Sequence, residues 1–174
     1  MKPIRNVEFG AMTQTASVLE DGAAIITISG AATIGSSTKL GEVVRVTQSA
    51  SRLFGFGTSS IVGQNVSVII PPPIDAAHND LLAGFGRKRS SDVVGKTRLV
   101  FGQRRTGDIF PMWLQVSEAP PDEQTAEPRF SAVVHEVVTQ QSFILFGGSE
   151  TQFKIHACSS RALAMLGLEA ESVQ

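Results

Sequence analysis

Two residues of this chain have the chemistry of a ligand-binding site, a histidine in a predicted helix and an arginine in a predicted strand. His78 follows Pro71–Pro73, and Leu81, Leu82 and Phe85 recur after it at helical spacing. The four side chains therefore share one face of a helix. A neutral imidazole on an apolar face can coordinate a metal ion. The same pattern is also typical of a half-buried surface histidine that binds nothing.

Arg98 lies in the segment Val93–Phe101, whose apolar and β-branched residues predict a strand. A guanidinium inside a pocket donates charge-assisted hydrogen bonds, which makes Arg98 a candidate for binding a polar ligand. The alternative is an exposed strand arginine paired with an acidic residue, and this is the commoner situation.

The elements that must position these residues follow the order of two strands, a helical block and three strands. The strongest signal is the alternation of apolar and other residues from Phe110 to Ser117. The predicted strands are Ala23–Ile28, Glu42–Val46, Val93–Phe101, Phe110–Ser117 and Arg129–Val138. Strands on both sides of a helical block predict an α+β domain with an antiparallel sheet packed on helices through one face.

The helical block has recognisable boundaries. Thr47 to Ser49 offer an N-cap for a short helix that Gly55 ends. The run Pro71–Pro73 marks a boundary, because prolines cannot continue a regular element. Asp75 can cap the next helix, which we expect to reach about Phe85. The long segment Ser29–Gly41, rich in small residues, is predicted to be a hairpin loop.

The two ends of the chain differ from its middle. Residues 1–20 are polar and weakly patterned, and we expect an N-terminal arm there. From residue 139 the pattern restarts with two short strands and the helix Ser159–Leu166, which Gly167 ends. The stretch Ser160–Leu168 is a weak repeat of Ser49–Phe56. We therefore predict a main domain at 21–138, and a linker with the start of a truncated second unit at 139–174.

Composition excludes several classes of partner. The formal net charge of -1 and the pI of about 6.3 do not favour binding to nucleic acid or to an anionic membrane. Cys158 is the single cysteine, so no disulfide can form within the chain, which suits a reducing compartment. The chain shows no signal-sequence core and no apolar run long enough to span a bilayer. We expect a cytoplasmic protein.

Three segments resemble the PAS family of sensory domains. They are Ser49–Phe56, Ile61–Pro71 and Gly102–Met112, which stand in the order and spacing of that family. Within the family the sequence is most similar to the FixL type, the haem-binding oxygen sensors. This resemblance implies a five-stranded antiparallel sheet that cups a pocket under short helices. It also implies homodimerisation, and signal transduction to an output domain or partner protein.

The resemblance also implies roles for individual residues. His78 matches the proximal ligand of haem b, and Arg98 matches the distal arginine that binds the diatomic gas, whether oxygen, carbon monoxide or nitric oxide. The remaining expected pocket residues share an apolar side chain, and an ordinary core would use the same residues. They are Ile69, Leu82, Val93, Val100, Leu114 and Val116.

The sequence departs from the FixL type at the positions that help to hold the haem propionates. Gly84 and Asp92 stand there, and neither side chain supplies a positive charge. Lys96 stands where an aliphatic pocket residue is expected. The basic cluster Arg87–Arg89 is near enough in sequence to replace the lost charge, although a solvated basic loop is the preferred interpretation.

Other cofactors and reactions lack their sequence signatures. Flavin photosensors of the PAS class need a reactive cysteine in the helical block, and Cys158 lies outside the domain, so flavin-cysteinyl photochemistry is not expected. The segment Gly95–Thr97 imitates the end of a P-loop, but Ser90 stands where the first glycine belongs. The three histidines have no zinc spacing, and no nucleophile elbow exists. We expect no enzyme activity.

Two alternatives to haem remain open from the sequence. One is a cofactor-free PAS module that self-associates through its sheet, where Trp113 should face outward from its strand. The other is a pocket for an apolar metabolite.

Overall fold

The computed structural model describes residues 23–30, 40–88, 93–149 and 152–168, without the side chains of 85–88, 149 and 153. The predicted N-terminal arm, most of the predicted loop 29–41, and the residues Arg89 and Asp92 lie outside this part of the chain.

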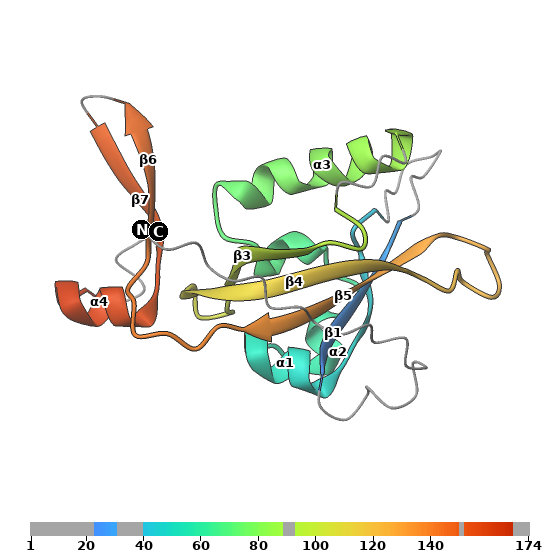
Figure 1. The fold of residues 1–174 in the computed structure, drawn as a ribbon, viewed down its shortest axis with the longest axis horizontal. Coiled ribbons are helices and arrows are strands. Elements are labelled where there is room, and N and C mark those ends of the chain that lie inside the picture. Colours follow the sequence, from blue (N-terminus) through green and yellow to red (C-terminus); the bar gives the residue numbers. More distant parts are fainter. Residues whose placement is uncertain (1–22, 31–39, 89–92, 150–151, 169–174) are drawn as a thin grey trace, which may run out of the picture.

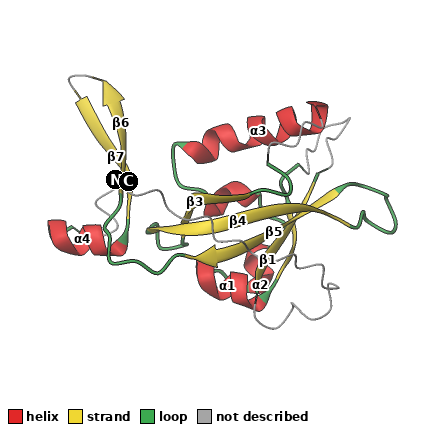
Figure 2. Ribbon diagram, in the orientation of Figure 1, coloured by secondary structure: helices red, strands yellow, loops and turns green. Residues whose placement is uncertain are grey.

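Five antiparallel strands form the main sheet (Figures 1 and 2). They are β1 (Ala24–Ser29), β2 (Val43–Val46), β3 (Thr97–Gln103), β4 (Ile109–Ala119) and β5 (Arg129–Glu136). Their order across the sheet is β2-β1-β5-β4-β3, so the strands before the helical block lie beside the last strand after it. The predicted α+β class and five-stranded antiparallel sheet are therefore confirmed.

The helical block connects β2 to β3. It contains α1 (Gln48–Phe54), α2 (Thr58–Ile61), the 3-10 helix η1 (Val66–Ile69) and α3 (Ile74–Lys88). Thr47 caps α1 as predicted, since its Oγ1 accepts from the amide of Ala50 at 3.3 Å. Gly55 ends the helix in the left-handed region at φ 74°, which glycine adopts without strain.

The core lies between the helices and one face of the sheet, which we call the inner face. Its fully buried residues include Ile26, Phe54 and Val134. The rings of Phe54 and Phe110 are tilted against each other at 5.5 Å between centroids. Gly102 makes this packing possible, because a Cβ there would lie 2.9 Å from Met112 Sδ and 3.0 Å from the Phe54 ring.

The alternation in β4 has the predicted orientation. Phe110 and Met112 are buried in the core, and Leu114 packs against it. Trp113 points to the opposite, outer face and is 44% exposed. Leu99 of β3 is its cross-strand partner and is 57% exposed, so two large apolar side chains are adjacent on the outer face.

Several boundaries differ from the predictions. The strand expected from Val93 begins only at Thr97, because Gly95 adopts φ 80° and the amide of Lys96 bonds back to the carbonyl of Val93 in a turn. The last strand ends at Glu136 instead of Val138. Helix α3 begins at Ile74, so Asp75 lies in its first turn, and the helix extends beyond the predicted end to Lys88.

After β5 the chain forms a separate hairpin and helix. They are β6 (Ile144–Ser149), β7 (Gln152–Cys158) and α4 (Ser160–Leu166), and Figure 1 shows them beside the main sheet. Ser159 caps α4 through its Oγ, which accepts from the amide of Ala162 at 3.3 Å. Gly167 ends the helix at φ 66°.

The second hairpin pairs its strands in the same register as the first. Ile26 pairs with Val46, and Ile144 pairs with Cys158. Both hairpins then shift register after one further pair, between Thr27 and Ile28 in the first and between Leu145 and Phe146 in the second. The bulge therefore falls at equivalent places in β1–β2–α1 and in β6–β7–α4.

The capping bonds match as well. The amide of Ile25 donates to Thr47 Oγ1 at 2.9 Å, and the amide of Phe143 donates to Ser159 Oγ at 3.0 Å. The backbone N–H of each capping residue donates in return to the carbonyl of the same partner residue, at 3.0 Å to Ile25 in β1 and at 2.9 Å to Phe143, which directly precedes β6. One local architecture thus occurs twice in the chain.

Among the described residues, a ring pair and a hydrogen bond join this second hairpin and helix to the main sheet. The rings of Phe101 and Phe143 meet edge to face at 5.1 Å between centroids. Ser160 Oγ lies 2.9 Å from Asp108 Oδ2, to which it donates a hydrogen bond. The first turn of α4 is thereby attached to the β3–β4 hairpin.

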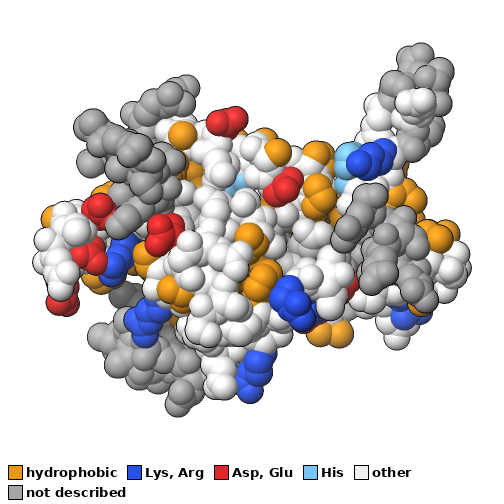
Figure 3. All heavy atoms as spheres, turned by 180° about the vertical axis from the view of Figure 1, so that it is seen from behind, with side chains coloured by type: hydrophobic (Ala, Val, Ile, Leu, Met, Phe, Trp, Pro, Cys, Tyr) orange, Lys and Arg blue, Asp and Glu red, His pale blue; other side chains and the backbone are white. Residues whose placement is uncertain are grey.

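None of the described helices is long and apolar enough to cross a bilayer. The view from behind shows acidic and basic side chains on the same face, with apolar side chains between them in small groups (Figure 3).

Candidate functional site

Helix α3 begins directly after the prolines, where the amide of Ile74 bonds the carbonyl of Pro71 at 3.0 Å. One turn later His78 is half-buried. Leu82 is half-buried too and packs against the main core. Leu81 is 64% exposed, so the prediction that it shares the buried face is wrong. The helix meets its neighbours along a narrower stripe than its apolar spacing suggests.

The imidazole of His78 points one nitrogen into the protein. Its Nδ1 is buried and has no hydrogen-bond partner among the described residues. Burial holds the pKa of His78 below its ordinary value, because desolvation disfavours the charged imidazolium. A neutral histidine with a buried, unsatisfied nitrogen costs stability, and such groups in native proteins usually have a functional or ligand-related reason.

Arg98 lies on β3 with its Cα opposite that of Leu114 in β4. Two residues further along β3, Val100 packs against the core, so alternation places Arg98 on the same inner face. Its side chain is exposed to solvent and takes part in an interaction within the chain.

The apolar residues predicted to wall a pocket fall into two groups. Ile69 is 4% exposed, and Leu82, Val100 and Leu114 pack with it in one hydrophobic cluster. Val116 is half-buried on β4 next to this cluster, and its backbone forms a bridge with Val94. The structure thus brings four of the six predicted wall residues together.

Val93 is set apart from these residues. It precedes the Gly95 turn and is 41% exposed.

One half of the inner face is less well covered than the other. The half under α1, around Ile26, Phe54 and Phe110, is fully buried. The other half is only half-buried. Its members are Ile28, Val100, Leu114, Val116, Phe130 and Ala132. These side chains form a continuous apolar stripe, because Val116 pairs with Ala132 across β4 and β5.

Gly84 and Lys96 are the described positions that depart from the FixL type. A Cβ added at Gly84 would meet nothing within 4 Å. Lys96 is exposed to solvent and takes part in an interaction within the chain.

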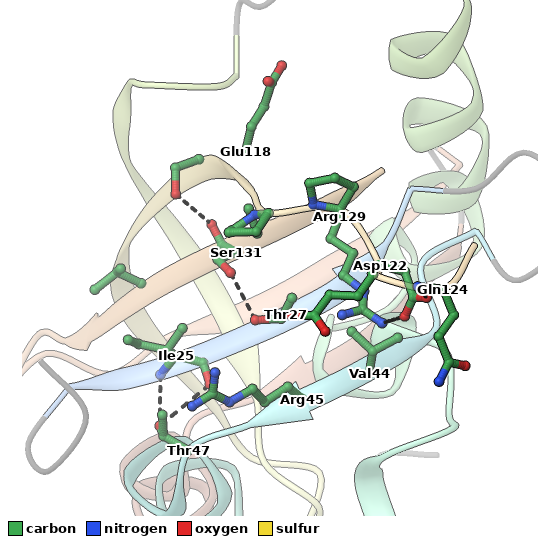
Figure 4. Close-up of a pocket in the computed structure, with 16 residues that line it drawn as sticks. Ile25, Thr27, Val44, Arg45, Thr47, Glu118, Asp122, Gln124, Arg129 and Ser131 are labelled. Carbon is green, nitrogen blue, oxygen red and sulfur yellow. Dashed lines mark hydrogen bonds and ion pairs between the residues drawn. The ribbon is translucent and has the colours of Figure 1, made fainter. Parts of the chain in front are cut away.

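The structure also contains a groove that the sequence analysis missed. It measures about 840 Å³ and lies on the outer face of the sheet, where β1, β2 and β5 meet the β4–β5 loop (Figure 4). Its wall combines apolar side chains, among them Ile25, Val44 and Val133, with polar ones. Thr27 Oγ1 and Ser131 Oγ share a hydrogen bond of 2.8 Å, and Arg129 pairs with Asp122. None of the predicted pocket residues lines this groove. The alternation of side chains along the strands predicts which residues face the outer side of the sheet, but no sequence motif marks them as a site.

Asp122 shapes the loop at one end of this groove. The amides of Thr125 and Gln124 each donate to its carboxylate at 2.9 Å, and these bonds hold the pKa of Asp122 below its ordinary value.

Arg104 is a second residue whose role the sequence did not reveal. Its guanidinium stacks 4.1 Å above the Phe110 ring and donates to Glu136 Oε1 at 2.6 Å. It also donates to the carbonyl of Leu53 and lies 3.4 Å from Asp108 Oδ2. One side chain therefore joins the end of α1, the β3–β4 hairpin and the end of β5. Its place in a hairpin turn was the only available signal.

No group of three potential metal-ligating side chains from histidine, cysteine, aspartate and glutamate occurs in the described part of the chain.

The architecture can be compared with solved structures. The chain superimposes on the PAS domain of a protein from Desulfitobacterium hafniense with a TM-score of 0.52, covering 69% of this chain and 98% of that one at 12% sequence identity. The chain has the PAS fold. Since the identity is low, the likeness to this PAS domain concerns the fold alone.

Sequence comparison finds relatives among signalling proteins. The chain is 32% identical over 92 residues to the sensor protein FixL of Bradyrhizobium diazoefficiens, which is 53% of this chain and 18% of FixL. It is 26% identical over 78 residues to a probable serine/threonine-protein kinase of Dictyostelium discoideum, of which it spans 5%. No family model matches the sequence. The chain thus corresponds to a small part of each relative, and the part shared with FixL bears out the predicted likeness to FixL-type PAS domains.

Proposed function

We propose that this PAS domain is a sensory module that binds haem b through His78 and responds to oxygen or another diatomic gas. The observation that carries the proposal is the buried, unpartnered Nδ1 of His78 on α3. When bound, haem would supply an iron that binds diatomic gases reversibly, and the His78 imidazole would hold that iron. The lowered pKa of His78 keeps its imidazole neutral at physiological pH, and this is the form that coordinates iron.

The half-buried stripe on the inner face supports the same proposal. A planar apolar guest needs a surface of aliphatic and aromatic side chains, and Leu114, Val116 and Ala132 offer one beside the helical block. A guest on this stripe would remove it from water without disturbing the fully buried half around Phe54.

Arg98 is proposed to position the gas. It stands on the inner face beside Leu114, at the edge of the apolar stripe. Its guanidinium can donate a charge-assisted hydrogen bond to a polarised gas molecule, and it can exchange that bond for its present interaction when the gas leaves. Such an exchange would make Arg98 the element that distinguishes the two states.

The proposal is tested by the absorption spectrum of the protein reconstituted with haemin. We expect a Soret band that shifts when carbon monoxide is added to the reduced protein. His78→Ala should abolish the band, whereas His135→Ala, which removes an exposed histidine from β5, should leave it unchanged. A band that survives His78→Ala would show that another residue binds the iron.

The role of Arg98 has its own test. Arg98→Ala should leave the Soret band in place and weaken oxygen binding more than carbon monoxide binding, because oxygen accepts the stronger hydrogen bond. Equal effects on both gases would remove Arg98 from the proposal.

A second function is a PAS module that acts by protein interaction without a cofactor. The observation in its favour is the outer face, where Trp113 and Leu99 are adjacent and largely exposed. The open surroundings of Gly84 point the same way, because no described residue lies within 4 Å of a Cβ built there to replace a contact to a haem propionate. This function predicts a colourless protein that self-associates, and Trp113→Ala should lower its molar mass in solution.

Both functions assign the domain to signalling rather than catalysis, with an output domain or a partner protein as the receiver of the signal. We propose that the signal leaves the domain through the end of β5, because Arg104 links the end of that strand to α1 and to the β3–β4 hairpin.

A further inference from the structure

The groove on the outer face of the sheet has the size and the composition of a small-molecule site. Its volume of about 840 Å³ lies within the range of ligand pockets in proteins. Ile25, Val44 and Val133 give it an apolar patch of half-buried side chains. Because it lies on the side of the sheet opposite to the inner face, none of the residues proposed to bind haem lines it.

A β-bulge brings a cation into this groove. Successive residues of a strand normally point to opposite faces of a sheet. Thr27 pairs with Arg45 and Ile28 pairs with Val43, so Val44 is the extra residue of a bulge in β2. Val44 and Arg45 therefore both line the groove, although they are adjacent in the sequence (Figure 4). Arg45 takes part in an interaction within the chain, and the five N–H donors of its guanidinium allow it to bind a further acceptor.

Hydroxyl groups continue the row that Arg45 begins. Thr27 pairs with Arg45 on one side and with Ser131 on the other, so the three side chains follow one another across β2, β1 and β5. Thr27 Oγ1 and Ser131 Oγ share one hydrogen bond of 2.8 Å, which uses the hydrogen of one hydroxyl and leaves that of the other to donate. A guanidinium beside a hydroxyl donor is a suitable site for a carboxylate.

The β4–β5 loop adds a fixed carboxylate to the groove. Asp122 Oδ1 accepts from the amides of Gln124 and Thr125 at 2.9 Å, and its Oδ2 pairs with Arg129. These bonds hold the pKa of Asp122 below its ordinary value, so the carboxylate stays ionised. Its oxygens offer about four acceptor positions, which leaves room for a bond from an ammonium group. Glu123 also lines this part of the groove, so the loop is net negative although Arg129 is present.

We propose that the groove binds a small zwitterion with an aliphatic group, the chemistry shared by aliphatic α-amino acids and by short peptides that contain them. The carboxylate of the ligand accepts from Arg45 and from the hydroxyl pair beside it, and its ammonium group donates to Asp122. Its aliphatic part covers Ile25 and Val133, which removes apolar surface from water. A ligand with only one of the two charges would leave either the arginine or the loop carboxylate without a charged partner.

An NMR titration of the 174-residue chain tests the proposal, with L-leucine and L-leucyl-L-leucine as probes. We expect saturable shifts in the amide signals of β1, β2 and the β4–β5 loop. L-Leucinamide lacks the carboxylate and N-acetyl-L-leucine lacks the ammonium group, so each should bind about tenfold more weakly than L-leucine. Tighter binding of L-leucine than of the dipeptide would assign the site to free amino acids, and the reverse order would assign it to short peptides.

Variants at the two charged positions test which group each one binds. Arg45→Gln should weaken the binding of L-leucine about tenfold and leave that of L-leucinamide unchanged, because the amide has no carboxylate to lose. Asp122→Asn keeps an oxygen for the loop amides, and it should weaken the binding of L-leucine but not of N-acetyl-L-leucine. The matched controls are Arg52→Gln on α1 and Glu118→Gln, whose side chain points away from the groove in Figure 4. Both should bind L-leucine as the unmodified chain does.

Three results would overturn the proposal. One is equal affinity for L-leucine and its two singly charged analogues, because the charged groups would then not select the ligand. Another is the lack of saturable binding of either probe at millimolar concentrations, and the third is a set of shifts centred on Leu114 of the inner face. The amide spectrum of each variant without ligand shows that it is folded. The affinities should be the same with and without haemin, so failure of this proposal leaves the proposed haem site untouched.

Discussion

The units β1–β2–α1 and β6–β7–α4 share their strand register, bulge position, helix caps and terminal glycines. They differ in what surrounds them. Phe54 and Ile26 are inside a core, whereas Leu166 and Ile144 face solvent. The comparison teaches that local geometry in this fold depends on a few local residues, while the stability of each unit depends on strands far away in the sequence.

The largest expected difference concerns the residues before the glycine caps. Phe54→Ala removes a fully buried ring that packs on Phe110, so it should lower the free energy of unfolding by about 3–5 kcal/mol. Leu166→Ala removes a half-exposed side chain and should cost less than about 1 kcal/mol. Urea unfolding followed by Trp113 fluorescence measures both. Similar losses would mean that α4 is buried in solution by a partner.

A second contrast concerns the close packing around Phe54. Gly102→Ala would place a Cβ 2.9 Å from Met112 Sδ and 3.0 Å from the Phe54 ring, and overpacking of this kind costs about 1–3 kcal/mol. Gly84→Ala lies in a helix with open surroundings and should stabilise the protein by about 0.5–1 kcal/mol. Thermal unfolding should therefore shift in opposite directions for the two variants. A shift in one direction for both would indicate that the core around Phe54 has room to adjust.

The matched helix caps should behave alike. Thr47→Ala and Ser159→Ala each remove a side-chain oxygen that accepts from two backbone amides, which costs about 1–2 kcal/mol. For Thr47 the loss appears in global unfolding. For Ser159 it should appear as faster hydrogen exchange within α4, with little change in the main sheet. If Ser159→Ala destabilises the main sheet equally, the two units unfold together.

The smallest effects are pH-dependent, and they have opposite signs for His78 in α3 and for Cys158 in β7. Burial lowers the pKa of His78, so below its ordinary value of 6.5 the unfolded chain binds a proton that the folded chain does not. Stability should therefore fall as the pH drops below about 6.5. His78→Gln should remove this dependence of stability on pH, and His135→Gln should not. Unfolding midpoints at several pH values measure it, and an unchanged slope in His78→Gln would assign it to other groups.

Cys158 should make the stability of β6–β7–α4 depend on pH in the alkaline range. It takes the place of Val46 in the repeat, and burial raises the pKa of its thiol above 9.0. The unfolded chain loses this proton first, so the second unit should become less stable as the pH rises through 9.0. Cys158→Val should remove the effect in hydrogen exchange of α4. Persistence of the effect in that variant would point to another titrating group.

The sequence predicts the elements of this fold that local chemistry determines. Thr47, Gly55, Ser159 and Gly167 mark helix ends through capping, and the alternation from Phe110 identifies β4. The boundaries it misses depend on tertiary context. The Gly95 turn shortens β3 because Val116 accepts a bond from its amide, and no local pattern indicates that contact.

The candidate site is predicted less completely. His78 and Leu82 face inward, since helical spacing determines their side of α3, but the same spacing wrongly includes Leu81. The outer groove and the contacts of Arg104 combine residues from distant strands, and only the fold brings them together. Residues that act through long-range pairing carry no signature in a single sequence.

The hydrogen bond between Ser160 and Asp108 links α4 of the second repeat to the β3–β4 hairpin of the main domain. Asp108 also contacts Arg104, which is attached to the last strand of the sensor and to the carbonyl end of α1. A displacement of the β3–β4 hairpin can therefore reach the first turn of α4 through this hydrogen bond. Where this hydrogen bond differs in strength between two states of the main domain, thermodynamic reciprocity requires that stabilising α4 also shifts the balance between those states.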